Sequence, residues 1–97
     1  MNSHNPIEVI KCMLKLTEAE AKVYLTLLEN GELTVKEIAN IVSYSRPTVQ
    51  KTLKKLLERG LVARNRFLRR GGGHGYIYRA IPTDTLDNDC LKNILKR

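Results

Sequence analysis

The sequence is constrained most by two helix signals that follow each other closely, at residues 35–42 and 46–59. The first signal begins with a capping box, in which the Thr34 hydroxyl and the Glu37 carboxylate each accept a backbone N–H at the start of a helix. Apolar residues then recur at helical spacing: Val35, Ile38, Ala39 and Val42. These features predict one short helix that buries a single face.

The second signal follows a tight turn at Ser43 and Tyr44. Ser45 is placed to cap the helix, and Pro47 lies in the first turn, where its missing N–H is tolerated. The apolar side consists of Val49, Leu53, Leu56 and Leu57. Gly60 is the predicted end of this helix.

Beyond Gly60 the residue pattern changes from helical to extended. Residues 61–68 and 76–81 are short runs of β-branched, aromatic and charged residues, separated by a basic glycine-rich loop from Arg69 to Gly75. Pro82 is expected to stop the second run. We therefore predict a β-hairpin over residues 61–81.

Three further helices are expected around this unit. Apolar spacing and Pro6 predict a helix near 6–15, and a capping box of Thr17 and Glu20 starts a second helix that ends at Asn30-Gly31. Its apolar face is assigned to Ala21, Tyr24, Leu25 and Leu28. The last helix, over 84–96, carries Leu86, Cys90, Leu91, Ile94 and Leu95 at helical spacing.

Two short helices followed by a basic hairpin are typical of a winged helix-turn-helix. The expected fold is thus mainly α with a small β-hairpin wing, in a single domain over residues 1–97. The helix-turn-helix occupies 35–59 and the wing 61–81. The helices at 6–15 and 84–96 are expected to form a dimer interface through Ile7, Ile10, Leu14, Leu91, Ile94 and Leu95.

Positive charge is concentrated in the helix-turn-helix and the wing. The chain has 17 Lys and Arg against 10 Asp and Glu, a net charge of +7. Residues 46–79 hold ten of the basic residues and only one acidic residue, Glu58. Such a distribution favours an anionic partner, and nucleic acid is the commonest one. The alternative is a basic surface that serves solubility alone.

Three sets of residues are candidates for contacts with double-stranded DNA. Hydrogen-bonding and charged side chains on the solvent face of 46–59 are suited to reading bases in a major groove: Arg46, Pro47, Gln50, Lys51 and Lys54. Hydroxyl and basic side chains in the turn and beside that face are suited to phosphates: Ser43, Tyr44, Ser45, Thr48 and Lys55. The wing set is Arg66, Arg69, Arg70 and His74. Packing in the turn is an equally good reading of Tyr44.

Enzyme chemistry is poorly supported by the sequence. The glycine-rich loop leads into a strand, whereas nucleotide-binding glycine motifs lead into a helix. No catalytic residues, cofactor or metal site are expected, and His74 is interpreted as a polar loop residue. Cys12 and Cys90 are interpreted as apolar packing residues, with a redox-sensitive bridge as the alternative. No apolar run approaches the length of a membrane span, and we expect a cytoplasmic protein.

The order and spacing of these segments resemble TrmB-type archaeal regulators and the broader MarR-like winged-helix group. Residues 16–28 are similar to their opening helix, 35–39 to their second helix, 45–62 to their recognition helix and following strand, and 76–82 to their second wing strand. The resemblance implies a dimeric transcription regulator that binds promoter DNA. Larger members carry a C-terminal sugar-sensing domain, and this sequence ends at Arg97, so sugar binding is not carried over.

The expected function is that of a sequence-specific transcriptional regulator that acts as a homodimer on a near-palindromic operator. Repression is the default expectation, and the sequence names no effector ligand. Two alternatives stay open. A protein-interaction adaptor would show an exposed apolar patch in place of the basic face, and an RNA-binding winged helix would prefer structured RNA to duplex DNA.

Overall fold

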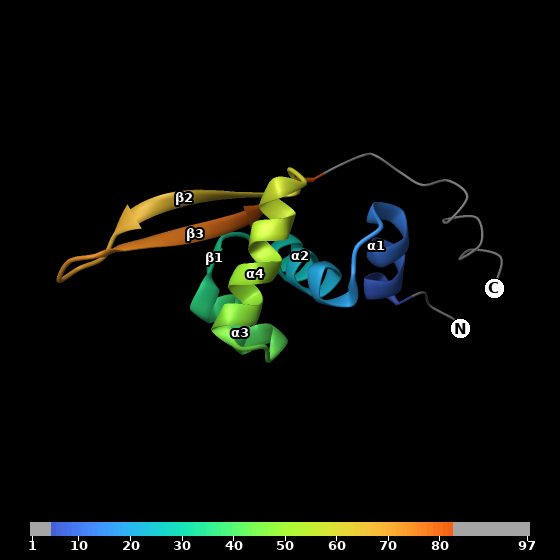
Figure 1. Ribbon diagram of the computed structural model, residues 1–97, viewed down its shortest axis with the longest axis horizontal. Helices are drawn as coiled ribbons and strands as arrows, with labels where there is room; N and C mark the ends of the chain where they lie inside the picture. Colours follow the sequence, from blue (N-terminus) through green and yellow to red (C-terminus); the bar gives the residue numbers. More distant parts are fainter. Residues whose placement is uncertain (1–4, 83–97) are drawn as a thin grey trace.

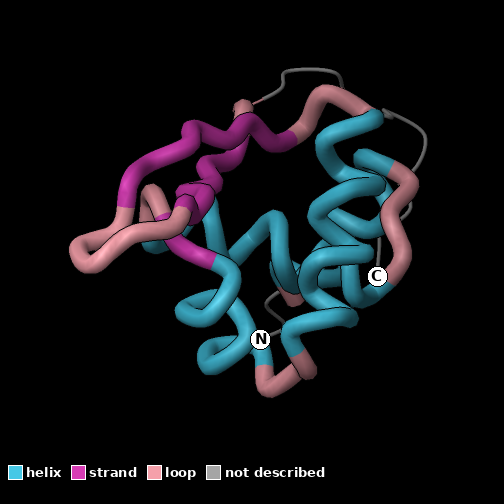
Figure 2. The backbone as a smooth tube through the Cα atoms, turned by 60° about the vertical axis from the view of Figure 1, so that its left-hand side comes forward, coloured by secondary structure: helices cyan, strands magenta, loops and turns pink. Residues whose placement is uncertain are grey.

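A computed structural model describes residues 5–82 of the chain. Its elements in chain order are α1 (Pro6–Leu14), α2 (Glu18–Asn30), β1 (Leu33–Thr34), α3 (Val35–Val42), α4 (Arg46–Glu58), β2 (Val62–Leu68) and β3 (His74–Ala80). The helices form one body, and the strands lie along one side of it (Figure 2). This arrangement confirms the winged helix-turn-helix. The helix predicted at 84–96, with Leu86, Cys90, Leu91, Ile94 and Leu95, lies outside the described residues.

The predicted capping interactions determine where the helices begin. The Thr17 hydroxyl accepts the Glu20 N–H, while the Glu20 carboxylate accepts the Thr17 N–H at 2.9 Å. The same reciprocal pair joins Thr34 and Glu37. Each pair satisfies two backbone donors that a helix start would otherwise leave without partners. Both capping boxes are therefore confirmed.

The core lies between α2, α3, α4 and the base of the sheet. Its largest fully buried side chains are Val23, Leu27, Ile38, Val49, Leu53 and Leu56. The prediction for α2 was partly wrong, because Leu28 is 43% exposed and Val23 and Leu27 take the central positions. Helix α2 contacts α3 and α4 as well as α1. Its buried face is therefore wider than predicted and includes Val23 and Leu27.

The sheet has three antiparallel strands in the order β1-β3-β2, where the sequence predicted a hairpin of two. Leu33 pairs with Tyr78 and Thr34 with Ile77. A strand of two residues is too short to show a period of two, and Thr34 also serves as the α3 cap, so β1 left no separate signal. Buried Leu33 fixes the edge of the sheet to the core.

The hairpin is longer at its tip than predicted. Its register runs from Val62 opposite Ala80 to Leu68 opposite His74, so that His74 and Gly75 belong to β3 and not to the loop. Glycine and histidine are weak strand formers, which is why the sequence placed them in the loop. Seven residues at about 3.4 Å each give an arm more than 20 Å long, which projects from the helical body (Figure 1).

Gly75 is the cross-strand partner of Phe67, and the phenyl ring covers it. A Cβ at position 75 would lie 2.6 Å from Phe67 Cζ, which is closer than two non-bonded carbon atoms approach each other in proteins. Glycine is required here for space and not for an unusual backbone angle. The ring thereby buries a stretch of backbone in the outer part of the arm.

The base of the hairpin is tied to the helical body by hydrogen bonds. The Tyr24 hydroxyl donates to the Ile81 carbonyl at 2.8 Å, and the Ile81 N–H donates to the Leu61 carbonyl at 2.8 Å. Burial raises the pKa of the Tyr24 phenol above its ordinary value. Tyr24 therefore stays protonated as the donor that connects α2 to the end of β3.

Helix α1 packs on α2 through residues predicted for the dimer interface, Ile7, Ile10 and Leu14, each half-buried against the core. Its C-terminus is capped from a distance by Arg59, which donates to the Lys15 carbonyl at 3.1 Å and to the Leu14 carbonyl at 2.6 Å. A guanidinium is well suited to this position because the last carbonyls of a helix carry partial negative charge.

Replacing Tyr24 with Phe is expected to lower the free energy of unfolding by about 1 kcal/mol, because the Ile81 carbonyl loses its donor. The raised pKa makes this difference depend on pH. As pH rises past about 10, the phenol ionises first in the unfolded chain, and this lowers the free energy of unfolding of the wild type. The difference in free energy of unfolding between the wild type and Tyr24→Phe therefore becomes smaller at high pH. Urea titrations from pH 7 to 11 measure both effects. Tyr76→Phe, at an exposed position, is the control and should have the same free energy of unfolding as the wild type. An equal loss of stability in Tyr76→Phe would contradict this role of Tyr24.

Replacing Gly75 with Ala is expected to destabilise the outer hairpin by about 1 kcal/mol, because the new methyl group displaces the Phe67 ring. In a Phe67→Ala background the same change should be close to neutral. Amide hydrogen exchange in β2 and β3 measures the stability of the hairpin in the wild type, in the two single variants and in the double variant, which together form a double-mutant cycle. Equal costs in both backgrounds would show that the ring is not the obstacle.

Candidate nucleic-acid interface

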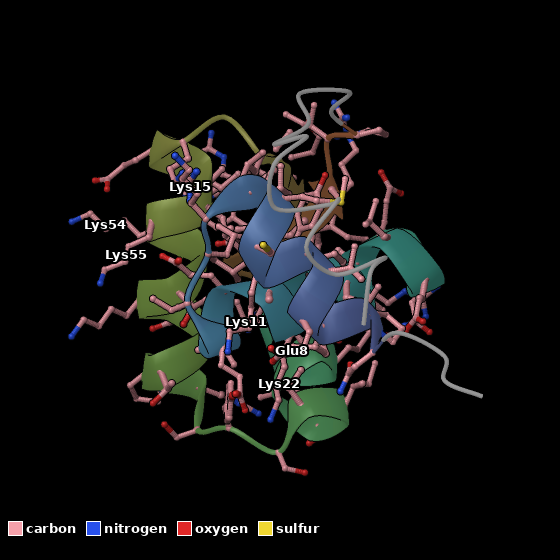
Figure 3. The ribbon with its side chains drawn as sticks, turned by 90° about the vertical axis from the view of Figure 1, so that its right-hand side faces the viewer. Glu8, Lys11, Lys15, Lys22, Lys54 and Lys55 are labelled. Atoms are coloured by element: carbon pink, nitrogen blue, oxygen red, sulfur yellow. The ribbon has the colours of Figure 1, made fainter. Side chains whose placement is uncertain are left out.

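Helix α4 buries one side and exposes the other. Val49, Thr52, Leu53 and Leu56 are buried. The candidate base-reading side chains Arg46, Pro47, Gln50, Lys51 and Lys54 are all exposed. Lys54 and Lys55 extend from α4 away from the protein body (Figure 3). The helix therefore presents a basic and hydrogen-bonding face that is held in place by its apolar one.

The start of α4 carries two hydroxyl groups with different tasks. Ser45 Oγ accepts the Thr48 N–H at 3.3 Å as the helix cap, and it donates to Thr48 Oγ1 at 2.9 Å. The Ser45 proton is thus already used within the protein. Thr48 Oγ1 accepts that bond and keeps its own proton for an outside acceptor such as a phosphate oxygen.

Tyr44 occupies the packing position that the sequence left as one of two readings. Its ring is half-buried against the core, with Lys22 Nζ 5.7 Å from the ring centroid. Lys22 in turn contacts Glu18 at 3.3 Å, and this hydrogen bond, with a smaller contribution from Tyr44, raises the pKa of Lys22. Its neighbour Ser43 is exposed and adopts the left-handed conformation that ends α3. The turn is thus ordered by contacts to α2.

The wing residues lie on the outer half of the arm. Arg66, Arg69, Arg70 and His74 are all exposed. The tip is closed by two backbone hydrogen bonds, from Arg69 N–H to the Gly73 carbonyl and from Gly72 N–H to the Arg69 carbonyl. Gly71, Gly72 and Gly73 all have positive φ angles, which only glycine adopts easily. The three glycines therefore make a slender tip flanked by arginines.

A cleft of about 500 Å³ separates α4 from the arm. Gln50, Lys54, Leu57 and Glu58 line it from the helix, and Arg64, Tyr76 and Tyr78 line it from the hairpin. The Arg64 guanidinium stacks over the Tyr76 ring, with Cζ 4.2 Å from the centroid. This stack holds a positive charge on the hairpin wall of the cleft.

Sequence reasoning missed Arg64 and Tyr76 as members of this surface. Arg64 pairs directly with Tyr78 across the strands, and Tyr76 is its diagonal neighbour. Side chains on the same face of two paired strands contact each other in this way. The register was the missing information, because it decides which residues of β3 lie beside Arg64.

The ten basic residues of the stretch 46–79 do not all contribute to the surface in the same way. Arg59 is used within the fold as the cap of α1. Glu58, the one acidic residue of the stretch, lines the cleft beside Lys54. The remaining basic side chains on α4 and the hairpin are exposed. The electrostatic surface is therefore carried by the outer face of α4 and by the arm.

Within residues 5–82 no group of three or more His, Cys, Asp or Glu side chains is placed to hold a metal ion. None of the helices in this part of the chain is long and apolar enough to span a membrane.

The sequence model of one protein family, described as "Sugar-specific transcriptional regulator TrmB", matches residues 10–84. An uncharacterized protein of Methanocaldococcus jannaschii is 42% identical over 88 residues, which are 91% of this chain and 72% of that protein.

Two solved structures are similar in fold. A possible transcriptional regulator from Methanosarcina mazei Go1 superposes with a TM-score of 0.68 at 27% identity, over 92% of this chain and 75% of that one. The structure of TrmBL2, described as an archaeal chromatin protein with a novel mode of DNA binding, gives a TM-score of 0.66 at 21% identity. That match covers 94% of this chain and 31% of TrmBL2. The family match spans most of the chain, and the fold agrees with it. The chain therefore belongs to the TrmB family and is a winged helix-turn-helix transcriptional regulator, not an enzyme.

Proposed function

We propose that the protein binds double-stranded DNA through the outer face of α4 and the wing, and that it regulates transcription at the sequences it occupies. The observation that carries this proposal is one basic surface shared by α4 and the arm, with Glu58 as its only acidic residue. A DNA-binding mode is part of the description of the structural relative TrmBL2. Counterion release on contact with phosphates supplies the affinity of such a surface.

The face of α4 supplies the groups for base recognition. Arg46 and Gln50 lie one turn apart, and Lys54 lies one turn further on. Arg can bind guanine N7 and O6, Gln can bind adenine N6 and N7, and Lys can bind guanine or phosphate. Pro47 and Lys51 lie beside this row. Among the residues predicted to contact phosphates, Ser43 and Lys55 are exposed and Thr48 keeps a hydroxyl proton to donate, so we assign phosphate contacts to these three. Ser45 and Tyr44, predicted for the same role, are used in the helix cap and in packing.

We further propose that the protein acts as a homodimer. Ile7, Ile10 and Leu14 of α1 pack on the core, and neither they nor Val9 and Met13 of the same helix are fully buried. A short helix that leaves this many apolar residues partly exposed favours a second packing partner. In a C₂ dimer, two α4 helices would enter successive major grooves about 34 Å apart and recognise a near-palindrome. Repression then follows from blocking access to a promoter.

The direct test is a selection of bound sequences from random duplexes, followed by competition with scrambled duplex and structured RNA across a salt series. We expect the selected duplex to bind at least about 10³-fold more tightly than scrambled duplex at physiological salt. Preferential binding of RNA would support the RNA-binding alternative. Absence of binding to both would support the adaptor. Either result would overturn the proposal.

Replacing Gln50 or Arg46 with Ala is expected to weaken binding to the selected duplex by about 1–3 kcal/mol and to relax the base preference at one position of each half-site. Fluorescence anisotropy on the selected duplex and its single-base variants measures both quantities. Lys15→Ala, on the loop that follows α1, is the matched exposed control. If both variants kept the wild-type affinity and base preference, Arg46 and Gln50 would not be base-reading residues.

Replacing Arg69 and Arg70 together with Ala is expected to weaken binding to all duplexes to a similar extent, because these side chains are assigned to the DNA backbone. The slope of log K against log salt should fall by about 1.8, or 0.9 for each lost phosphate contact. The charge-matched control is Lys11→Ala with Lys15→Ala, at the end of the molecule opposite the wing tip (Figure 1). If the control lost the same amount of slope, the salt dependence of binding would depend on the total charge of the protein and not on the wing.

A further inference from the structure

Leu68 is the most exposed large apolar side chain that the structure describes, with 76% of its surface accessible. It is the last residue of β2, and two arginines separate it from the three glycines of the tip. Exposing a leucine to water at the end of a projecting arm is unfavourable for an isolated protein. Single exposed apolar side chains are common on protein surfaces, so the significance of Leu68 depends on its position and its neighbours.

The contacts of the arm show that Leu68 contributes little to holding it together. Its cross-strand partner, His74, is exposed as well. The neighbouring Phe67 points to the other face, where its ring covers Gly75. The outer arm is thus packed by Phe67 and Gly75, while Leu68 is left free on the face that also carries Arg64 and Arg66.

The surroundings of Leu68 identify the chemistry of a partner. Arg66, Arg69 and Arg70 lie within two positions of it along the chain, and the sequence has no acidic residue between Glu58 and Asp84. A single apolar side chain in a stretch of the arm that carries three arginines matches a partner with anionic groups outside and an apolar stack inside. Duplex DNA has this construction, with phosphates along the edges of each groove and stacked bases at its floor.

The dimensions of the arm agree with access to a minor groove. Leu68 lies six residues beyond Val62, about 20 Å from the point where the hairpin leaves the core. With α4 in a major groove, the adjacent minor groove is about half of a 34 Å turn away. Beyond Leu68 the chain continues through Arg69 and Arg70 to three glycines, Gly71 to Gly73, so the turn itself is slender and its bulk comes from cationic side chains that a narrow, negatively charged groove attracts.

We propose that Leu68 is an apolar wedge that enters the minor groove between two base pairs, partly unstacks them and kinks the duplex. The inference rests on the proposed DNA binding and adds a second form of recognition to it. Steps that unstack easily, such as TA and CA, would be preferred under the wing although no side chain reads their edges. Arg69 and Arg70 would hold the flanking phosphates while the leucine is inserted.

The test uses the full chain and the selected duplex, with 2-aminopurine placed in turn at each position under the wing. Unstacking raises the fluorescence of this base analogue. We expect the wild type to raise the fluorescence at one step, and Leu68→Ala to lose about half or more of that rise while its Kd changes by less than about tenfold. Leu68→Met should keep the rise, since it preserves an apolar side chain of similar volume. Leu28→Ala, an exposed leucine on α2, is the matched control.

The outcomes separate this proposal from the one on which it depends. A tightly bound duplex with no fluorescence rise at any position would overturn the wedge and leave DNA binding intact. Leu68→Lys that binds more tightly and gives the wild-type rise would also overturn it, because the contact would then be electrostatic. Failure of the wild type to bind any duplex would overturn both proposals together.

Discussion

The burial of one stripe of α4 is the constraint on which the rest of the molecule depends. Val49, Leu53 and Leu56 are fully enclosed by α2 and α3, so the helix can occupy one rotational position only. A shift of one residue would turn it by about 100° and push charged side chains such as Lys54 toward the core. The outward direction of the basic face is therefore a result of hydrophobic packing, and the candidate base-reading side chains are positioned by buried residues on the other side of the helix.

The hairpin is stabilised in two different ways along its length. At its base, Val62 and Tyr78 belong to the core, and Tyr24 ties the end of β3 to α2. Farther out, none of the helices within residues 5–82 lies behind the strands (Figure 1), and cross-strand contacts such as Arg64 on Tyr76 and Phe67 over Gly75 stabilise the hairpin. The arm is therefore anchored firmly where it meets the body and held by its own cross-strand pairs where it meets solvent.

The sequence was most informative wherever an interaction spans three or four residues. The capping boxes at Thr17 and Thr34 and the cap at Ser45 are of this kind, and the helix starts followed from them directly. Interactions between distant segments could not be predicted in the same way. Arg59 reaches carbonyl groups 44 and 45 residues away, β1 exists only because Leu33 meets Tyr78, and the stack of Arg64 on Tyr76 needs the strand register. The candidate base and phosphate contacts remain predictions.

Arg59 also has a mechanical consequence. It directly follows the last residue of α4, and its guanidinium holds the last two carbonyl groups at the end of α1. If α1 slides or turns, it must either break both bonds or pull the end of α4 with it. These two bonds link the C-terminal end of α4, the helix that exposes Gln50 and Lys54, to α1, which lies at the end of the molecule opposite the wing tip (Figure 1). The position of α1 and the orientation of the exposed face of α4 are in this way coupled through one side chain.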